Sequence, residues 1–550
     1  SYILAPEQGR AGYAALLADL ARTEMLPTRI AHFWLATEGE TFRPGSSFFD
    51  RNLETGFYAL TALAQELGSA DLPQPPHITV FTTGAAQLRD EALPDPEKAM
   101  IAGPARVIPR ELPGFSCATV DIELPRAETG LLARIKGAAA PDISSRLLEE
   151  LLAEPTSTAA AWRGEKRYEL DWRPVELPPA ALPTFNKGGT YLITGGYGGS
   201  GLPIARHLLA EYAATVLLIS REGLPERGGW AQYLRNHSPA NRTATRIRAV
   251  EALEEIGKGA VLPLAADVCN SGQMRAALKA AEGRFGPLTG VIHGAGSIDD
   301  GPLLAKSDEQ IAKVLAPKVS GLRVLDSLFP DGSLDLMVLF SSSSTVTGPA
   351  GQVDYIAANE YLNAAAAHRR GGKTRVVEVD WGDWAATGMA SAAMAARQGS
   401  DGPSDPVPCA QALLDSEGFD GSGNRIYHTR LDAARHWLLN EHRTADGTAV
   451  MPGTGYIELA AEAMTALGMA EDGALPAFEL HDLYFLRPLA VADDSPADLL
   501  IRLLAAEDGY ARSFYTASGE GYALHAHATV TFAQAQSPAA PADPSAPAHR

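Results

Sequence analysis

The sequence predicts an α/β protein in which two successive α/β regions are followed by a smaller α+β region. Apolar strand-like runs alternate with helical segments through roughly the first 390 residues, the pattern of an α/β fold. A strand near residue 190 leads into a glycine-rich loop and then a helix. From about Leu431, a helix at Tyr456–Leu467 is followed by strand-like runs up to Phe532, which predicts a helix packed on an antiparallel sheet.

Composition narrows the classes of function. The chain has 550 residues, with 46 Lys and Arg against 66 Asp and Glu and a net charge of −20. This balance argues against nucleic acid or an anionic membrane surface as a partner. No apolar run approaches the ~20 residues that span a bilayer, and the start shows no signal-peptide pattern. Cys117, Cys269 and Cys409 are too far apart for a disulfide framework or a zinc site. We expect a soluble cytoplasmic protein.

The first region alternates helices and buried strands without a phosphate-binding loop. Tyr13–Ala21 and Asn52–Leu67 have helical spacing, and Arg29–Leu35 and His77–Thr82 are typical of buried strands. None of these strands ends in a glycine-rich loop. We interpret the region as a Rossmann-like unit without a nucleotide site, with an unrelated small α/β domain as the alternative.

Segments rich in small residues and proline separate the regions. Tyr168–Pro174 is strand-like and precedes a proline-rich stretch, Pro174–Pro183. Residues 390–425, rich in Ala, Gly, Ser and Pro, predict a lid and a linker. The Ala- and Pro-rich tail at 533–550 predicts a linker or a disordered end.

The glycine cluster after the strand at Thr190 predicts a dinucleotide site. Glycine lets the backbone turn tightly and approach a pyrophosphate, and the following helix, Leu202–Tyr212, offers its N-terminal N–H groups. The candidate cofactor-binding residues here are Thr194, Gly195, Gly196, Gly198, Gly199 and Gly201.

Later strand ends supply further cofactor contacts. The strand at Thr215–Ile219 ends in Ser220-Arg221, where an arginine favours the 2′-phosphate of NADP; a plain surface arginine is the alternative. Two more strand ends contribute Asp267, Val268, Gly294, Ala295 and Gly296.

A serine, a tyrosine and a lysine then predict ketone reduction. The strand at Leu334–Phe340 runs into a serine cluster containing Ser342, and Tyr355 opens a helix. A tyrosine can protonate a forming alkoxide when a cation lowers its pKa from ~10, and a serine hydroxyl can hold the oxygen. Asn359, not a lysine, follows Tyr355 by one turn, so Lys318 is the candidate cation.

In these motifs the sequence resembles the ketoreductase domain of polyketide synthases, in the short-chain dehydrogenase/reductase superfamily. The resemblance implies that Lys318, Ser342, Tyr355 and Asn359 are catalytic, in the order that these ketoreductases use. It implies NADPH as hydride donor, a β-ketoacyl chain on the phosphopantetheine of an acyl carrier protein as substrate, and other polyketide synthase domains as partners. The matching segments are Tyr191–Gly201, Ser220-Arg221, Asp267-Val268, Val291–Gly296, Lys318–Gly321, Phe340–Ser342, Tyr355–Asn359 and Trp381–Trp384.

The same resemblance divides the ketoreductase into two Rossmann-like subdomains. Residues 1–185 resemble its truncated structural subdomain, which binds no cofactor, and residues 186–400 its catalytic subdomain. The first match rests on Asn52–Leu67, Glu97-Lys98 and Gly103–Pro109.

One loop suggests the stereochemistry. Ile298-Asp299-Asp300 resembles the Leu-Asp-Asp motif of B-type ketoreductases, and Thr347 stands where A-type enzymes place a tryptophan. The resemblance implies a D-configured β-hydroxyl; a merely solvated pair of aspartates is the alternative.

Residues 430–532, after a linker at 401–429, resemble the first half of a polyketide synthase dehydratase, an α+β hotdog unit. His436–His442 and Val450–Tyr456 carry the match, and the dehydratase histidine would be His442. Four residues separate His442 from Gly447, one more than usual, and the second hotdog with its catalytic aspartate is not in this sequence. We expect no dehydratase activity, and a packing role for His436.

Together these features predict an excised region of a polyketide synthase, with a ketoreductase preceding a dehydratase half. Two alternatives remain open. One is a catalytically inactive ketoreductase that serves as a scaffold in a megasynthase. The other is a free-standing reductase of small ketones.

Overall fold

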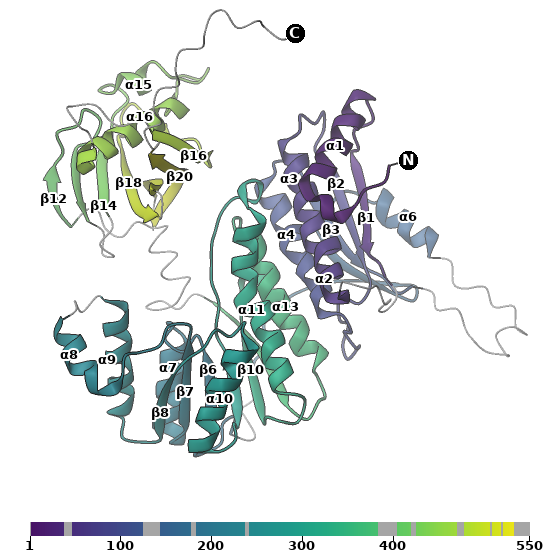
Figure 1. The fold of residues 1–550 in the computed structure, drawn as a ribbon. Helices are drawn as coiled ribbons and strands as arrows, with labels where there is room; N and C mark the ends of the chain where they lie inside the picture. Colours follow the sequence, from purple (N-terminus) through teal and green to yellow (C-terminus); the bar gives the residue numbers. More distant parts are fainter. Residues whose placement is uncertain are drawn as a thin grey trace, which may run out of the picture. The chain divides into compact units, whose positions relative to one another are not determined.

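The computed structural model describes residues 2–37, 47–124, 143–177, 183–236, 241–382, 404–419, 425–469, 478–506, 509–518 and 521–532. These residues belong to two compact units, 1–389 and 390–550, and each is described by itself (Figure 1). Among the described helices, none combines the length and apolar character needed to cross a bilayer.

The first subdomain is an α/β layer whose sheet has the order β1-β2-β3-β4-β5. β1 to β4 run parallel, and β5 closes the sheet as an antiparallel hairpin strand. β2 is buried along its whole length, as expected for an inner strand of a parallel sheet, although it carries His77, Thr79 and Thr82. The elements are α1 (Gly9–Arg22), β1 (Arg29–Leu35), α2 (Phe48–Leu53), a π-helical turn η2 (Glu54–Tyr58), α3 (Ala59–Ser69), β2 (His77–Thr82), a 3₁₀ helix η3 (Pro96–Ile101), α4 (Ala102–Glu111), β3 (Ser116–Asp121), α6 (Ser144–Leu152), β4 (Ala159–Arg163) and β5 (Lys166–Glu169).

The second subdomain is a parallel sheet in the order β11-β10-β9-β6-β7-β8. The strand order reverses between β6 and β9, and such a switch point opens a crevice at the carboxyl ends of the strands. The elements are β6 (Thr190–Thr194), α7 (Gly201–Tyr212), β7 (Thr215–Ser220), α8 (Trp230–Asn236), α9 (Arg242–Glu254), β8 (Ala260–Ala265), α10 (Ser271–Phe285), β9 (Gly290–His293), α11 (Asp308–Leu328), β10 (Leu336–Ser342), α12 (Ser344–Thr347), α13 (Val353–His368) and β11 (Arg375–Trp381).

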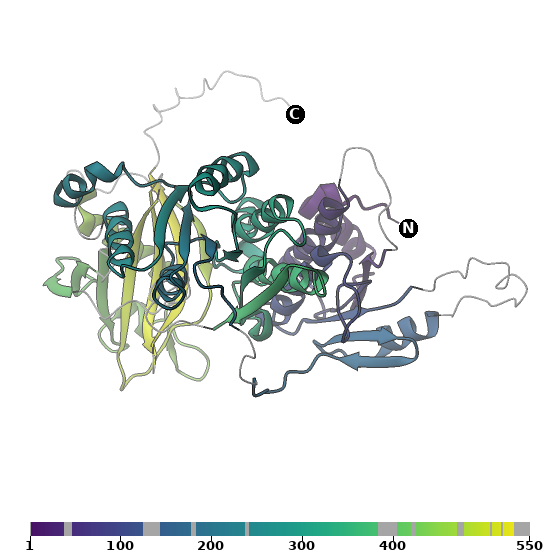
Figure 2. The same cartoon turned by 90° about the horizontal axis from the view of Figure 1, so that it is seen from below.

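Helix α13 joins the two subdomains. It packs on β10 and α11 of its own subdomain and on η3 and α4 of the first, and both views show it between the two sheets (Figures 1 and 2). A Cβ at Gly103 of α4 would lie 2.3 Å from the main-chain oxygen of Val353, so only glycine permits this close approach. Buried side chains from both subdomains, such as Met100 and Ile356, share one core.

The second unit is an antiparallel sheet packed against helix α16 (Gly453–Met464). Tyr456 and Leu459 of α16 are buried in one apolar cluster with Ile501 and Phe514 of the sheet. The sheet has the order β12-β13-β14-β18-β19-β20-β16, with β12 (Ser404–Pro408), β13 (Ser416–Phe419), β14 (Arg425–Leu431), β16 (Phe478–Phe485), β18 (Ala497–Ala506), β19 (Gly509–Ser518) and β20 (Gly521–Phe532). The remaining elements are α15 (Trp437–Asn440), a small pair β15 (Ala449–Val450) and β17 (Ala490–Val491), and the π-helical turn η6 (Thr465–Met469).

The predicted class, α/β followed along the chain by an α+β unit, is confirmed, and two predicted boundaries were wrong. Residues 401–429, predicted as a linker, contain β12, β13 and most of β14. These short strands lie at the sheet edge, where β12 tolerates Pro406 and Pro408 because an edge strand needs fewer amide donors. The strand predicted at Tyr168–Pro174 ends at Glu169. The predicted tail at 533–550, residues 390–403 and 420–424 of the predicted lid, and Trp384 lie outside the described residues.

Candidate active site

The glycine-rich loop lies directly against the segment after β9. Gly195 has φ +67°, and a Cβ there would lie 2.8 Å from the main-chain oxygen of Gly294 and 2.9 Å from the Cα of Ala295. A Cβ at Gly201 would lie 2.8 Å from the oxygen of Gly196. Only glycine fits at these positions, so the loop forms a bare backbone cradle at the N-terminus of α7. Gly198 closes the turn, since its N–H donates to the oxygen of Gly195 at 2.8 Å.

Thr194 ties the cradle to β9. Its hydroxyl lies 2.7 Å from Nδ1 of His293 and accepts from the N–H of Ala295 at 3.2 Å. His293 is fully buried, and this burial, assisted by the charge of Lys318, lowers its pKa to about 3. The imidazole is therefore neutral at physiological pH, and we assign it a structural part in the cradle.

Basic side chains gather at the carboxyl end of β7. Ser220 donates to the main-chain oxygen of Glu222 at 2.8 Å, which turns the chain so that Arg221 is exposed. The Glu222 carboxylate pairs with Arg246 at 2.8 Å and with Arg242 at 3.3 Å. Arg221 could be predicted here from the sequence, whereas Arg242 and Arg246 come from α9 and have no sequence signature.

The next strand ends complete this edge. Asp267 accepts the N–H of Cys269 at 2.9 Å, and Val268 is buried. A Cβ at Gly321 of α11 would lie 3.0 Å from Val268, so this side chain packs directly on the helix that carries Lys318. Gly199 and Gly296 lie in the loops that follow β6 and β9.

Lys318 and Tyr355 come together from different elements. Lys318 is buried in α11, and its ammonium nitrogen lies 5.9 Å from the centre of the Tyr355 ring in α13. The same nitrogen donates to the main-chain oxygen of Phe340 at 2.6 Å. Burial lowers the pKa of Lys318 to about 7, and the charge of Asp380 acts in the opposite direction. A lysine that titrates near neutrality can take up and hand on a proton.

Asn359 and the serine cluster complete the constellation. The Asn359 amide donates to the main-chain oxygen of Tyr355 at 2.8 Å, and its Oδ1 is buried without a hydrogen-bond partner among the described residues. The Ser341 hydroxyl donates to the oxygen of Asn359 at 3.3 Å, which fixes the end of β10 to α13. Ser342, half-buried, accepts the N–H of Ser344 at 3.2 Å. The structure thus gathers the predicted lysine, tyrosine, asparagine and serine at the carboxyl end of the sheet.

The Ile298-Asp299-Asp300 loop lies beside the segment that leads to Tyr355. Gln352 donates to Asp300 at 3.2 Å. Ile298, Asp299 and Asp300 are half-buried, whereas Thr347 is exposed. The two aspartates are therefore part of a packed loop and not a purely solvated one.

Sequence reasoning missed two buried charges at this place, Lys306 and Asp354. They form an ion pair of 2.6 Å, and each side chain is 1% exposed. The local signal for Lys306 is its place directly after the apolar run Pro302–Ala305, but the sequence alone does not show its partner.

In the second unit, His442 is exposed and its main-chain oxygen accepts the N–H of Val450 at 2.9 Å. Among the described residues, its side chain makes no hydrogen bond or ion pair. His436 is buried, and its Nδ1 lies 3.0 Å from the N–H nitrogen of Asp432, in keeping with the packing role expected for it.

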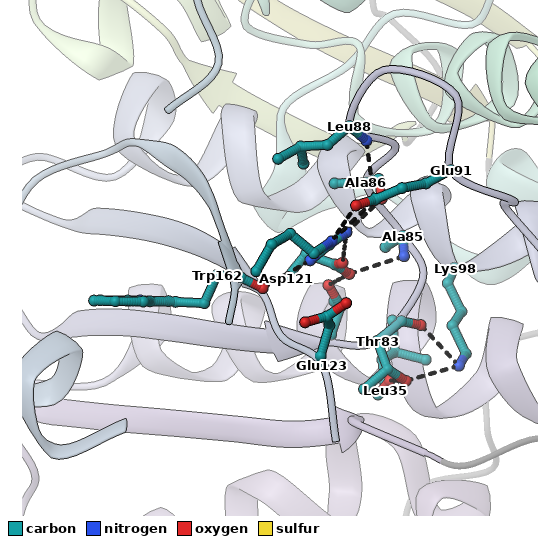
Figure 3. A network of polar contacts seen from close by, with 12 residues as sticks. Leu35, Thr83, Ala85, Ala86, Leu88, Glu91, Lys98, Asp121, Glu123 and Trp162 are labelled. Atoms are coloured by element: carbon teal, nitrogen blue, oxygen red, sulfur yellow. Dashed lines mark hydrogen bonds and ion pairs between the residues drawn. The ribbon is translucent and has the colours of Figure 1, made fainter. Parts of the chain in front are cut away.

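The first sheet has a different carboxyl edge (Figure 3). Asp121 at the end of β3 accepts from Thr82 at 2.7 Å and from the N–H of Ala85 at 2.9 Å, and it pairs with Arg163 at 2.9 Å. Lys98, buried nearby, donates to the main-chain oxygen of Thr83 at 3.0 Å. In the first subdomain, Asp121, Arg163 and Lys98 thus occupy the carboxyl edge of the sheet. In the second subdomain, the corresponding edge carries the glycine cradle.

Comparison with known families assigns most of the second subdomain and part of the second unit. Residues 189–386 match the family model described as KR domain, and residues 412–517 match the polyketide synthase dehydratase domain. A KR domain is an oxidoreductase domain, and such domains use a nicotinamide cofactor.

Curated relatives and solved structures agree. The chain is 36% identical over 220 residues to 6-methylsalicylic acid synthase of Aspergillus terreus, and 37% identical over 218 residues to 5-methyl-1-naphthoate synthase of Streptomyces sahachiroi. These matches cover 39% and 40% of this chain but 12% of each relative. A structure of A-type ketoreductases from a modular polyketide synthase covers 69% of this chain and 73% of its own, with a TM-score of 0.52 and 31% identity. The first ketoreductase of the tylosin polyketide synthase covers 69% and 72%, with a TM-score of 0.52 and 27% identity.

The cradle, the gathered lysine, tyrosine and asparagine, and these similarities lead to one assignment. Residues 189–386 are a ketoreductase domain of the polyketide synthase type, and residues 412–517 belong to a polyketide synthase dehydratase domain.

Proposed function

We propose that this chain reduces a β-ketoacyl thioester, carried by an acyl carrier protein, to the β-hydroxyacyl thioester with NADPH. One observation carries the proposal. Lys318, Tyr355 and Asn359 meet at the carboxyl end of the parallel sheet, beside a glycine cradle that a single methyl group would obstruct. This is an arrangement for proton transfer next to a dinucleotide site.

The cradle fits the pyrophosphate of a dinucleotide. Gly195 and Gly201 leave the backbone bare, and the N-terminal N–H groups of α7 favour a negative charge. The exposed Arg221 would hold a 2′-phosphate, which favours NADPH over NADH. When bound, the cofactor supplies the hydride.

The protein's own residues handle the oxygen and the proton. Ser342 donates to the ketone oxygen and orients it, and the Tyr355 hydroxyl protonates the oxygen as negative charge develops. The Lys318 ammonium, when charged, stabilises the tyrosinate that forms and then restores its proton. Asn359 fixes the first turn of α13 through the main chain of Tyr355, which keeps the hydroxyl in place.

We assign B-type stereochemistry, giving the D-configured hydroxyl. The packed Ile298-Asp299-Asp300 loop beside Tyr355 and the threonine at position 347 support this assignment. The solved relative of 31% identity is described as A-type, so the configuration of the product distinguishes this chain from that relative.

The other regions receive supporting parts. We assign the structural role to residues 1–185 and the catalytic role to residues 186–400, acting in the cytoplasm with other polyketide synthase domains. We infer that the chain by itself does not dehydrate the product, because the exposed His442 side chain forms no ion pair with a carboxylate among the described residues.

The test is NADPH consumption with a β-ketoacyl thioester, first as a small-molecule thioester and then on an acyl carrier protein, with chiral analysis of the product. We expect a D-alcohol, and loss of turnover in Tyr355→Phe with NADPH binding retained. NADPH binding without turnover on the carrier-bound substrate would indicate an inactive structural domain instead. Turnover confined to small free ketones would indicate a free-standing reductase.

A further inference from the structure

Lys306 contacts both the aspartate loop and the start of the catalytic helix. Its ammonium nitrogen pairs with Oδ2 of Asp354 at 2.6 Å and donates to the main-chain oxygen of Asp299. Asp354 immediately precedes Tyr355, and its Oδ1 accepts the Tyr355 N–H at 2.9 Å. One buried lysine therefore connects the loop to the residue next to the tyrosine.

Two further hydrogen bonds hold the same two segments together. Gly301 donates to the main-chain oxygen of Gly351 at 3.0 Å, and Gln352 donates to Asp300 at 3.2 Å. Gly351 has φ +83°, a conformation that favours glycine, and a Cβ there would lie 3.6 Å from the nitrogen of Gly301. The loop and the segment before α13 are thus hydrogen-bonded at two points, and the buried Lys306 adds a third connection.

The first subdomain supports this pairing from behind. Glu111, at the end of α4, accepts the N–H groups of Gly351, at 2.6 Å, and of Leu303. Gln65 of α3 donates to the main-chain oxygens of Leu303 and Lys306, both at 2.8 Å. The first subdomain therefore holds the segment that follows the aspartate loop, at Leu303 and Lys306, and the residue Gly351 before α13.

The charges of Lys306 and Asp354 explain why the loop has one alignment against α13. Removing two charges from water is costly, and an apolar pair of similar volume is often as stable, so the ion pair is weak evidence for a stabilising role. An apolar pair could slide, whereas an ammonium with fixed acceptors on both segments defines one register. Lys306 and Asp354 are both buried, and each makes a second hydrogen bond, Lys306 to the oxygen of Asp299 and Asp354 to the N–H of Tyr355.

We propose that Lys306 is a positioning residue for the reduction: with Asp354 it fixes the aspartate loop against the first turn of α13, and so determines which face of the ketone is presented to Tyr355. The reaction and its stereochemistry rest on the function proposed above. The register of the loop does not depend on them, and it can be measured without substrate.

The experiment compares the wild-type chain with Lys306→Met/Asp354→Leu, which replaces the pair by apolar side chains, and with Asp354→Asn. The matched control is Arg369→Met/Asp326→Leu, which removes a 2.6 Å pair between the far end of α13 and α11. Hydrogen exchange is followed in segments 298–306 and 349–355. Reduction of an acetoacetyl thioester by NADPH is followed by kcat, KM and the enantiomeric ratio of the product.

We expect faster exchange in both segments for the Lys306 double variant, and unchanged exchange there in the control. The enantiomeric ratio should fall at least ~10-fold, corresponding to about 1.4 kcal/mol between the two transition states, while NADPH affinity changes less than twofold. A folded double variant with wild-type exchange, or with wild-type enantiomeric ratio, overturns the proposal. Wild-type protein that binds NADPH without reducing the thioester overturns the proposed function, and the exchange data then still decide whether Lys306 fixes the loop.

Discussion

The ammonium nitrogen of Lys318 lies 5.9 Å from the centre of the Tyr355 ring, although the two residues come from different helices. The lysine is buried and has a pKa of about 7, because desolvation disfavours its charged form. Tyr355 is half-buried at the first turn of α13. Lys318, whose pKa is near neutral, therefore lies next to the phenol ring of Tyr355. The first two predictions concern these two residues.

Lys318→Met should change how stability depends on pH. In the folded chain Lys318 has a pKa of about 7, against 10.5 as its ordinary value, so between these values the unfolded state binds one more proton. Lys318 therefore costs most stability below pH 7, and the cost falls by about 1.4 kcal/mol per pH unit above it. The stability gained by Lys318→Met should be largest at pH 6.5 and about 2 kcal/mol smaller at pH 8.5. Urea unfolding at the two pH values measures this difference; an equal difference at both would contradict the burial of a charge at this position.

Tyr355→Phe should abolish reduction without loss of the fold. The substitution removes the proton donor and keeps the ring, so we expect kcat to fall by roughly 10²–10⁴ and NADPH affinity to remain within about twofold. Stopped assays of β-hydroxyacyl product and fluorescence titration with NADPH measure the two quantities. Tyr361→Phe, a buried tyrosine two turns along the same helix, is the control and should keep its turnover. Wild-type rates in Tyr355→Phe would remove the tyrosine from the mechanism.

Gly195→Ala should obstruct the cradle. The backbone there has φ +67°, and the added methyl would meet the oxygen of Gly294 at 2.8 Å. We expect a loss of roughly 1–3 kcal/mol in unfolding free energy and at least ~10-fold weaker NADPH binding. Gly228→Ala is the matched control, since a Cβ at Gly228 meets nothing within 4 Å. Thermal unfolding and titration should separate the two variants, and equal behaviour would show that the close approach is unimportant.

The parallel sheets could be predicted well from the sequence. Arg29–Leu35 and His77–Thr82 coincide with β1 and β2. β2 is buried at every position, as expected for a parallel strand covered on both faces. β1 lies at the sheet edge and is mostly exposed or half-buried, so the prediction of a buried strand there was wrong. β12 and β13 could not be predicted in the same way. They are short and contain Pro or Gly, and they are defined by the pairing of β12 with β13 and of β13 with β14 rather than by any local pattern.

The candidate site likewise contains residues that could be predicted from local sequence and residues that could not. Tyr355, Lys318 and the glycines belong to motifs, so their positions could be predicted. Lys306 and Asp354 are 48 positions apart, and nothing local distinguishes them from exposed charges. Their burial and their contacts exist only in the folded chain, which is why an ion pair next to Tyr355 became visible only in the structure.

Arg221→Ala should weaken discrimination between the two nicotinamide dinucleotides. Arg221 is exposed at the end of β7, where a 2′-phosphate would lie, and the charge is the feature that NADPH has and NADH lacks. We expect NADPH affinity to fall about 10-fold at low salt while NADH affinity stays nearly constant. Arg370→Ala, an exposed arginine just after α13, controls for the change in net charge. Equal losses for both dinucleotides would assign Arg221 to general electrostatics and move the 2′-phosphate toward Arg242 and Arg246.

His442→Ala should leave the products of this chain unchanged. Dehydration of a β-hydroxyacyl thioester needs a base for the α-proton and an acid for the leaving hydroxyl. His442 is exposed, and in the described part of the chain its side chain has no carboxyl partner. We therefore expect both the wild type and the variant to accumulate the β-hydroxyacyl thioester at equal rates, with no α,β-unsaturated product by mass spectrometry. Arg443 follows His442 and forms an ion pair of 2.7 Å with Asp493. Arg443→Ala removes this pair and controls for disturbance of the backbone around His442. An unsaturated product formed by the wild type and lost in His442→Ala would show that the single hotdog unit completes a dehydratase site.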